Sequence, residues 1–222
     1  MESLIPVIFI AAVLIFITLR FLFSKKAIVK RKLKKTKSRP ILSFNSGETA
    51  KISGKIEIVG EALQAPLSGR KCAAYMVLVE QKVSNGKSTH WRTIIKEEKA
   101  CRYVIRDGYK CAWVNHNNCK SYIVQDKNYR SGLWNDATPE LENFLNLHGY
   151  KSENILGLNK TVRYKEGVLE NGERVAVAGK GEWKFSNLVG IPDEYDRLLV
   201  FDSANGHPVY LSDDPDTFAK NN

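Results

Sequence analysis

Three cysteines and one histidine in the middle of the chain come nearest to a metal-binding set: Cys101, Cys111, His116 and Cys119. Thiolates and an imidazole are the ligands of closed tetrahedral zinc sites. Nine residues separate the first two cysteines, however, and the sequence contains no C-x-x-C pair. Because Cys101 and Cys111 lie in apolar or strand-like surroundings, we expect them to be small buried side chains. We therefore assign no metal ligand.

Ser68 and Cys72 are potential nucleophiles, but neither stands in a catalytic motif. Ser68 lies in Leu67-Ser68-Gly69, which lacks the G-x-S-x-G sequence that presents a serine on a strained turn. Cys72 with one of the four histidines would form a thiol dyad, yet no local signature links them. A strand residue facing the core explains Cys72 more simply. With no phosphate-binding glycine motif either, the sequence predicts no catalytic residue and no cofactor.

The first 23 residues are expected to anchor the chain in a membrane. Between Ser3 and Leu19 no residue is charged, and a helix over Leu4–Phe23 would span roughly 30 Å, the thickness of the hydrocarbon core. A cleaved signal peptide would carry basic residues before its apolar core, whereas here the preceding charge is Glu2. A buried terminal helix is the other alternative, and the length and flank argue against it.

Residues 24–46 form a strongly basic juxtamembrane arm. Seven of its residues are candidates for contact with anionic lipid headgroups: Lys25, Lys26, Lys30, Arg31, Lys32, Lys34 and Lys35. Short basic flanks stay in the cytosol, so we expect the N-terminus outside and the C-terminal domain cytosolic. A solvated linker that only fixes this topology is an equally open interpretation. Because the arm supplies nearly all of the net charge of +10, the remaining chain does not indicate nucleic-acid binding.

Residues 47–222 read as one α+β domain, mainly antiparallel sheet with one central helix. Strand patterns cover Ala50–Val59 and Cys72–Val83, and Trp91–Glu98 returns with Trp91, Thr93 and Ile95 on one face. The helix is marked by Thr138 as cap, Pro139 at its first position and Gly149 at its end. Further strands follow over 161–169 and 175–177, with a last hairpin over 198–202 and 208–211. Four cysteines without a dense pattern fit a reducing compartment.

Two blocks of sequence resemble a known family. The first is Gly54-Lys55-Ile56-Glu57-Ile58 followed by Leu63-x-x-Pro66-Leu67-Ser68-Gly69-Arg70-Lys71-Cys72-Ala73-Ala74-Tyr75; the second is Tyr164–Gly179, of the form E-x-x-L-x-x-G-x-x-V-x-V-x-G. Both are similar to the GIDE domain, also called the BAM ("beside a membrane") domain. That domain occurs in membrane-anchored mitochondrial RING-type ubiquitin ligases and in many prokaryotic membrane proteins. The resemblance runs from Gly54 to the end of the chain.

The resemblance implies two functions from different classes. The first is a non-catalytic, single-pass membrane protein that presents a GIDE-type interaction domain to an unidentified protein partner. The second is membership of a RING-type ubiquitin transferase family, acting with a partner that supplies the RING. A RING needs eight Cys or His ligands arranged with C-x-x-C pairs for two zinc ions, and the family's ligases carry a second transmembrane helix. The four dispersed cysteines here favour the interaction module.

Overall fold

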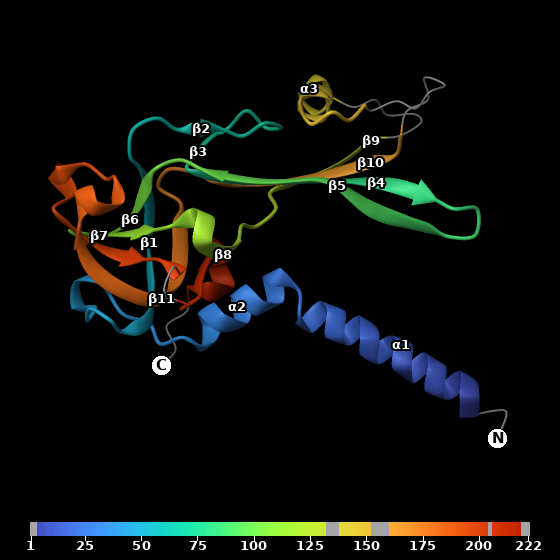
Figure 1. The fold of residues 1–222 in the computed structure, drawn as a ribbon, viewed down its shortest axis with the longest axis horizontal. Helices are drawn as coiled ribbons and strands as arrows, with labels where there is room; N and C mark the ends of the chain where they lie inside the picture. The colour runs from blue at the N-terminus through green and yellow to red at the C-terminus, as the bar shows by residue number, and fades with distance from the viewer. Residues whose placement is uncertain (1–3, 132–137, 152–159, 204–205, 219–222) are drawn as a thin grey trace.

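The computed structural model describes residues 4–131, 138–151, 160–203 and 206–218 (Figure 1). Its α-helices are α1 (Leu4–Leu22), α2 (Lys25–Lys35) and α3 (Pro139–Leu147). Its strands are β1 (Thr49–Ile58), β2 (Leu63–Gln64), β3 (Lys71–Cys72), β4 (Ala74–Ser84), β5 (Thr89–Ala100), β6 (Tyr103–Asp107), β7 (Lys110–Val114), β8 (Cys119–Tyr122), β9 (Lys127–Ser131), β10 (Val162–Leu169), β11 (Arg174–Phe185), β12 (Arg197–Phe201) and β13 (Val209–Ser212). The predicted α+β class is confirmed.

A five-stranded mixed barrel forms one half of the domain. Its strand order is β1-β6-β7-β12-β11, and β11 closes the barrel by pairing with β1. β13 and β8 continue the sheet beyond β11, and the pairs β12–β7 and β13–β8 are parallel. The barrel core is built from inward-facing β-branched and aromatic residues such as Ile52, Val177 and Phe201. Alternation along each strand places these side chains on one face, and burial of that face stabilises the barrel.

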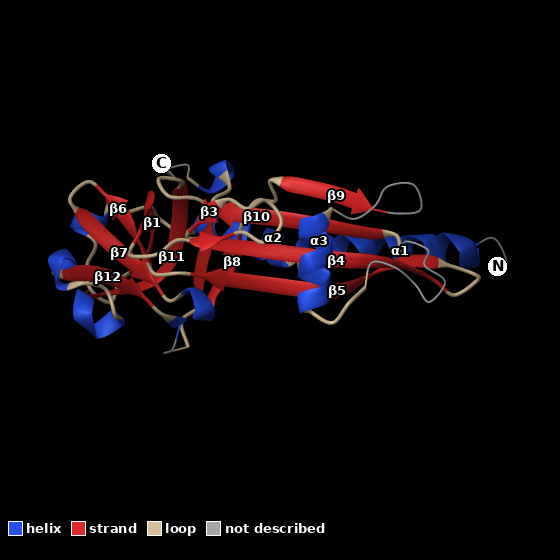
Figure 2. Cartoon of the chain, turned by 90° about the horizontal axis from the view of Figure 1, so that it is seen from above, coloured by secondary structure: helices blue, strands red, loops and turns tan. Residues whose placement is uncertain are grey.

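A long four-stranded sheet, in the order β5-β4-β10-β9, extends from the barrel (Figures 1 and 2). α3 covers one of its faces, with Leu141, Phe144 and Leu145 packed on sheet residues that include Val77 and Val79. As expected from the sequence, the Thr138 hydroxyl accepts the Leu141 N–H, Pro139 opens the helix and Gly149 adopts a positive φ of 74°. The predicted central helix is therefore confirmed, and its apolar stripe fixes it to the sheet.

Two details of the sheet differ from the sequence prediction. The strands of the expected last hairpin, β12 and β13, do not pair with each other, because β11 lies between them. In β5, the register shifts beside Ile94, where β4 pairs Val79 with Ile95 but Glu80 with Thr93. This bulge turns Ile95 toward α3, whereas Trp91 lies on the other face. The prediction that Trp91, Thr93 and Ile95 share one face is wrong.

Residues between α2 and β1 also enter the core. Ile41 and Phe44 are buried among the barrel residues, and the Phe44 ring meets Phe201 edge-on with centroids 5.6 Å apart. The Trp183 indole donates to the Phe44 carbonyl at 2.9 Å. Lys51 exchanges backbone hydrogen bonds with Lys37 and Arg39, which lie on this same connection. The second half of the basic arm therefore folds together with the domain.

The N-terminal helices form a bent pair. Among the described residues, no single helix is long and apolar enough to cross a membrane, but Ile8–Arg20 and Lys25–Lys35, bent by 61°, together have the length and composition of a crossing segment or a signal sequence. Apolar side chains of α1 such as Phe9 and Phe16 are more than half exposed. Since α2 packs on the domain, α1 carries the exposed apolar surface of the pair.

Candidate functional site: the basic helix and its acidic clamp

α2 is set in place at both ends by local sequence. The Ser24 hydroxyl accepts the Ala27 N–H at 3.2 Å and caps the helix start, and the N–H of Thr36 returns to the Lys32 carbonyl at its end. Lysines 32, 34 and 35 lie in the last turn, where cations interact favourably with the helix dipole. Its composition is nevertheless too charged for a stable isolated helix, so docking must supply most of its stability.

A narrow apolar stripe on α2 is buried against the domain. Val29 and Leu33 stand one turn apart and are both completely buried. They pack with Ala176 and Ala178 of β11 and with Tyr210 of β13. Burying a Val or Leu side chain contributes about 1.5–3 kcal/mol. The small alanines of β11 let the helix backbone approach the barrel closely, so the strand sequence and the helix stripe are complementary.

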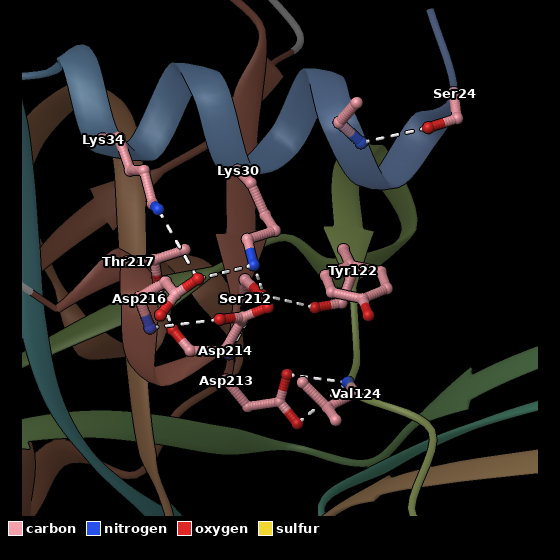
Figure 3. Close-up of polar contacts among 11 residues, drawn as sticks. Ser24, Lys30, Lys34, Tyr122, Val124, Ser212, Asp213, Asp214, Asp216 and Thr217 are labelled. Atoms are coloured by element: carbon pink, nitrogen blue, oxygen red, sulfur yellow. Dashed lines mark hydrogen bonds and ion pairs between the residues drawn. The ribbon is translucent and has the colours of Figure 1, made fainter. Parts of the chain in front are cut away.

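An ion-pair cluster holds the same face of α2 to the segment after β13 (Figure 3). Lys30 Nζ lies 2.7 Å from an Asp214 carboxylate oxygen and 3.0 Å from one of Asp216, and Lys34 Nζ lies 3.5 Å from Asp216. The Asp214 carboxylate also accepts the Asp216 N–H at 3.1 Å, which fixes both acids in one short turn. The hydrogen bond to Asp214 raises the pKa of Lys30, and Lys30 lowers the pKa of Asp216. We call these four residues the acidic clamp.

Two buried polar side chains hold the segment that carries the clamp. The fully buried Lys51 donates from Nζ to the Thr217 carbonyl at 3.0 Å, and burial lowers its pKa. Asp213 accepts the Val124 N–H at 2.8 and 3.1 Å through its two oxygens, while burial raises its pKa to about 7 (Figure 3). Strand β13, the turn that follows it and β8 are thereby joined into one platform for α2.

A second network holds the start of α2. Lys25 Nζ lies 3.2 Å from Glu98 of β5, whose carboxylate also accepts the Ser121 hydroxyl and lies 3.3 Å from His116 Nε2. His116 Nδ1 is 3.0 Å from the Tyr103 hydroxyl. Burial alone would raise the pKa of Glu98, but His116, Ser121 and Lys25 outweigh burial and lower that pKa to about 2. Glu98 is thus an anion that joins β5, β8 and α2.

The seven basic residues proposed for lipid contact separate into two sets. Lys25, Lys30 and Lys34 pair with carboxylates of the domain, and Lys26 lies over the Tyr122 ring at 5.0 Å. The other three of the seven, Arg31, Lys32 and Lys35, are exposed and make none of these contacts with the described part of the domain. Docking of α2 was missed from the sequence; the signal that could have found it is the one-turn spacing of Val29 and Leu33 within the lysines.

The sequence candidates for zinc do not come together. Cys111 lies near Arg106 and Glu57, whereas Cys119 lies near Glu98, and Cys101 contacts the Cys72 carbonyl. Among residues 4–131, 138–151, 160–203 and 206–218, no group of three or more His, Cys, Asp or Glu side chains is placed to hold a metal ion.

The four cysteines are free thiols, and burial raises the pKa of each one. The pKa of Cys72 rises to about 11 and that of Cys119 to about 12. A thiol must lose its proton to act as a nucleophile, so these groups are poorly reactive near neutral pH. The other candidate nucleophile, the Ser68 hydroxyl, lies 3.4 Å from Arg70 Nε.

A polar cavity of about 430 Å³ opens at the other end of the barrel, beside Glu57, Arg106 and Tyr195. Its central charges are paired with each other: Arg106 donates to both oxygens of Glu57, and the Tyr195 hydroxyl donates to Glu57 at 2.7 Å. The pKa of Tyr195 rises to about 12, because of burial and this carboxylate. We assign no ligand to this cavity.

The two sequence blocks that carry the family resemblance meet in the structure. Buried Glu166, from the second block, accepts the Leu67 N–H of the first block at 2.8 Å. The Ala73 N–H donates to the Leu169 carbonyl at 2.7 Å. A Cβ on Gly167 would lie 2.4 Å from the Val124 carbonyl oxygen, so only glycine fits there. Leu67 packs with the residues under α3, whereas Ala73 and Leu169 are buried in the barrel core, so these contacts fix the β2–β3 segment on the long sheet beside the barrel, which is a scaffold role.

Fold and site together describe an α+β protein in which an exposed apolar helix continues into a basic helix clamped to a β-barrel. Comparison with known proteins adds no family to this description: no family model, no curated protein and no solved structure matches the chain.

Proposed function

We propose that this chain is a single-pass membrane protein that presents a GIDE-type interaction domain to the cytosol, directly beside the inner leaflet. The observation that carries the proposal is the continuation of α1, exposed and apolar, into α2, whose buried stripe belongs to the domain. A helix that is apolar on all sides is stable in lipid rather than in water. Only Phe23 and Ser24 separate the two helices, so a spanning α1 would hold the domain close to the bilayer.

The charge on α2 supports the cytosolic orientation. Basic residues that flank a spanning helix remain on the cytosolic side. Arg31, Lys32 and Lys35 are exposed, and each cation near an anionic leaflet contributes about 1 kcal/mol. The other lysines are held by the domain, so lipid contact at α2 rests on these three.

The GIDE assignment is supported by the contact between the two sequence blocks. Residues that look like family signatures lie about one hundred positions apart, yet Leu67, between β2 and β3, donates its N–H to Glu166 of β10. An interaction module needs such a rigid junction, because a binding surface is precise only when its supporting elements are fixed.

The alternative function, a ubiquitin transferase that depends on a partner for its RING, has less support. A covalent role for Cys72 or Cys101 would require a thiolate, whereas burial raises the pKa of both groups. A scaffold role for this chain within such an enzyme would still be an interaction function, and the same domain would carry it.

Membrane fractionation with a topology reporter tests the proposal. We expect the full chain to remain in the membrane pellet after alkaline carbonate washing, and a reporter fused after Asn222 to be active only in its cytosolic form. A matched chain with Leu14 and Phe16 replaced by Lys should be released by the wash. Release of the unmodified chain, or activity of an export-only reporter, would refute the proposal.

A further inference from the structure

One face of the long sheet carries positive charge and lies on the side of the domain from which α1 leaves. Tyr75, Val77 and Val79 of β4 face α3, so strand alternation places Lys82 on the opposite face. In Figure 1 the sheet is seen edge-on, with α3 on one side and α1 and α2 on the other. Figure 2, viewed from above, shows α1 beneath the sheet. We call this surface the anchor-side face; it includes Lys82, Trp91, Lys96, Arg163 and Lys165.

Within the part of the chain that the structure describes, Lys82, Lys96 and Lys165 on this face form no ion pair with a carboxylate. Lys82 and Lys96 are exposed, and Lys165 is half-buried. Glu80 is only 13% exposed and is neutralised by Arg163, whose Nε lies 2.7 Å from its carboxylate. The carboxylate of Glu98, also on this face, contacts Lys25 and His116.

Trp91 adds an aromatic group at the same place. The Arg163 guanidinium lies over the Trp91 ring, 4.3 Å from its centroid. Tryptophan and basic residues are the side chains enriched at the headgroup level of membranes. A surface with exposed lysines around an Arg-covered tryptophan is therefore complementary to anionic headgroups.

α1 leaves the domain on the side of this face (Figure 1). α1 and the β4–β5 hairpin extend from the barrel toward the same side (Figure 1). The hairpin tip contains Asn85, Lys87 and His90, which are exposed and too polar for the hydrocarbon core. If α1 spans the bilayer as proposed, the chain must turn further at Ser24 so that the hairpin stays outside. A turn that directs α1 away from the sheet would leave the anchor-side face on the side of the domain nearest the bilayer.

We infer that the anchor-side face is a second membrane contact, which binds anionic phospholipid headgroups of the leaflet that α1 crosses. This inference rests on the proposed function and extends it: α1 supplies attachment, and the sheet face fixes the orientation of the domain on the surface. The resulting orientation leaves α3 and the opposite sheet face turned toward the cytosol.

Energy transfer from the hairpin to the bilayer tests the inference. The full chain carrying Ser88→Cys is reconstituted in vesicles of phosphatidylcholine, with or without phosphatidylserine, and a donor dye is attached to the introduced thiol by maleimide. Acceptor dyes are carried on lipid headgroups. The native thiols react slowly because burial raises the pKa of each. We expect greater transfer in the phosphatidylserine vesicles and loss of that increase in high salt.

A matched pair of triple variants separates charge placement from net charge. Replacing Lys82, Lys96 and Lys165 by Gln removes three cations from the anchor-side face, and should shift the equilibrium away from the surface by on the order of 100-fold. Replacing Lys71, Arg92 and Lys99 by Gln removes three cations elsewhere and should leave the transfer unchanged. All proteins are first floated with their vesicles after carbonate washing.

The outcomes distinguish the two proposals. Failure to float refutes the membrane anchor itself. Flotation with equal transfer in both lipids, or equal loss of transfer in both triple variants, overturns the lipid-binding face while leaving the anchor intact.

Discussion

Replacing Leu33 by Ala should destabilise the whole domain, because α2 is part of its core. Leu33 is completely buried between β11 and β13, and Leu-to-Ala changes at such positions cost about 2–5 kcal/mol. α2 lies at the edge of the barrel, where the surroundings can relax into the space, so we expect a value of about 2–3 kcal/mol. A basic arm that only linked anchor to domain would show no effect.

Urea unfolding of residues 24–222, followed by circular dichroism, measures this loss. With a denaturant slope of about 2 kcal/mol per molar, the midpoint should fall by roughly 1–1.5 M. Lys35→Ala is the matched control, since Lys35 is exposed on the same helix and such changes stay within about 0.5 kcal/mol. If Leu33→Ala moves the midpoint no more than Lys35→Ala, the docking of α2 is refuted.

Asp213, Glu98 and the buried thiols give further tests. The folded pKa of Asp213, about 7, exceeds its ordinary value of 3.8, so its contribution to stability is lost as pH rises through 7. The free energy of unfolding of Asp213→Asn, measured by urea titration, should therefore rise by about 1–2 kcal/mol relative to that of wild type between pH 5 and pH 8. A difference that stays constant with pH would contradict this. The pKa of Glu98 is lowered to about 2, so the stability that its charged form contributes is present above pH 4.5 and lost toward pH 2. Glu98→Gln should lower the free energy of unfolding by about 1–3 kcal/mol at pH 7. An unchanged free energy would show that the network does not stabilise the fold. Cys72 and Cys119 should resist a disulfide reagent at pH 8 until urea is added. The purified domain should also contain no stoichiometric zinc and should discharge no ubiquitin from a conjugating enzyme. Bound zinc or ubiquitin discharge would favour the enzyme alternative.

Local signals in the sequence predicted most strands and the central helix. Thr138 and Pro139 identified the start of α3 because capping depends on neighbouring residues. The pairing of strands depends on distant contacts, and this is where prediction failed. β12 and β13 follow each other along the chain, which favours a hairpin, but each pairs with a different part of β11.

The clamp could not be read from the sequence for the same reason. Lys30 and Asp216 are 186 positions apart, and a run of lysines gives no indication of which member meets a carboxylate. The bulge at Ile94 adds one residue to β5 and reverses the faces beyond it, a change that alternation alone cannot locate. The apolar helix α1 was visible because its signal is a simple run of residues, whereas the apolar signal for the docking of α2 consists of Val29 and Leu33 alone.

Zero-length carbodiimide cross-linking of the full chain in intact membranes tests most directly whether α2 is clamped to the segment that follows β13. The reagent joins an amine to a carboxylate only when they are in contact, as Lys30 Nζ is with Asp214 and Asp216 at 2.7 and 3.0 Å. We expect mass spectrometry to detect a Lys30–Asp214 or Lys30–Asp216 cross-linked peptide, which should be absent in Lys30→Gln. An intact, accessible Lys30 with no such product would contradict it.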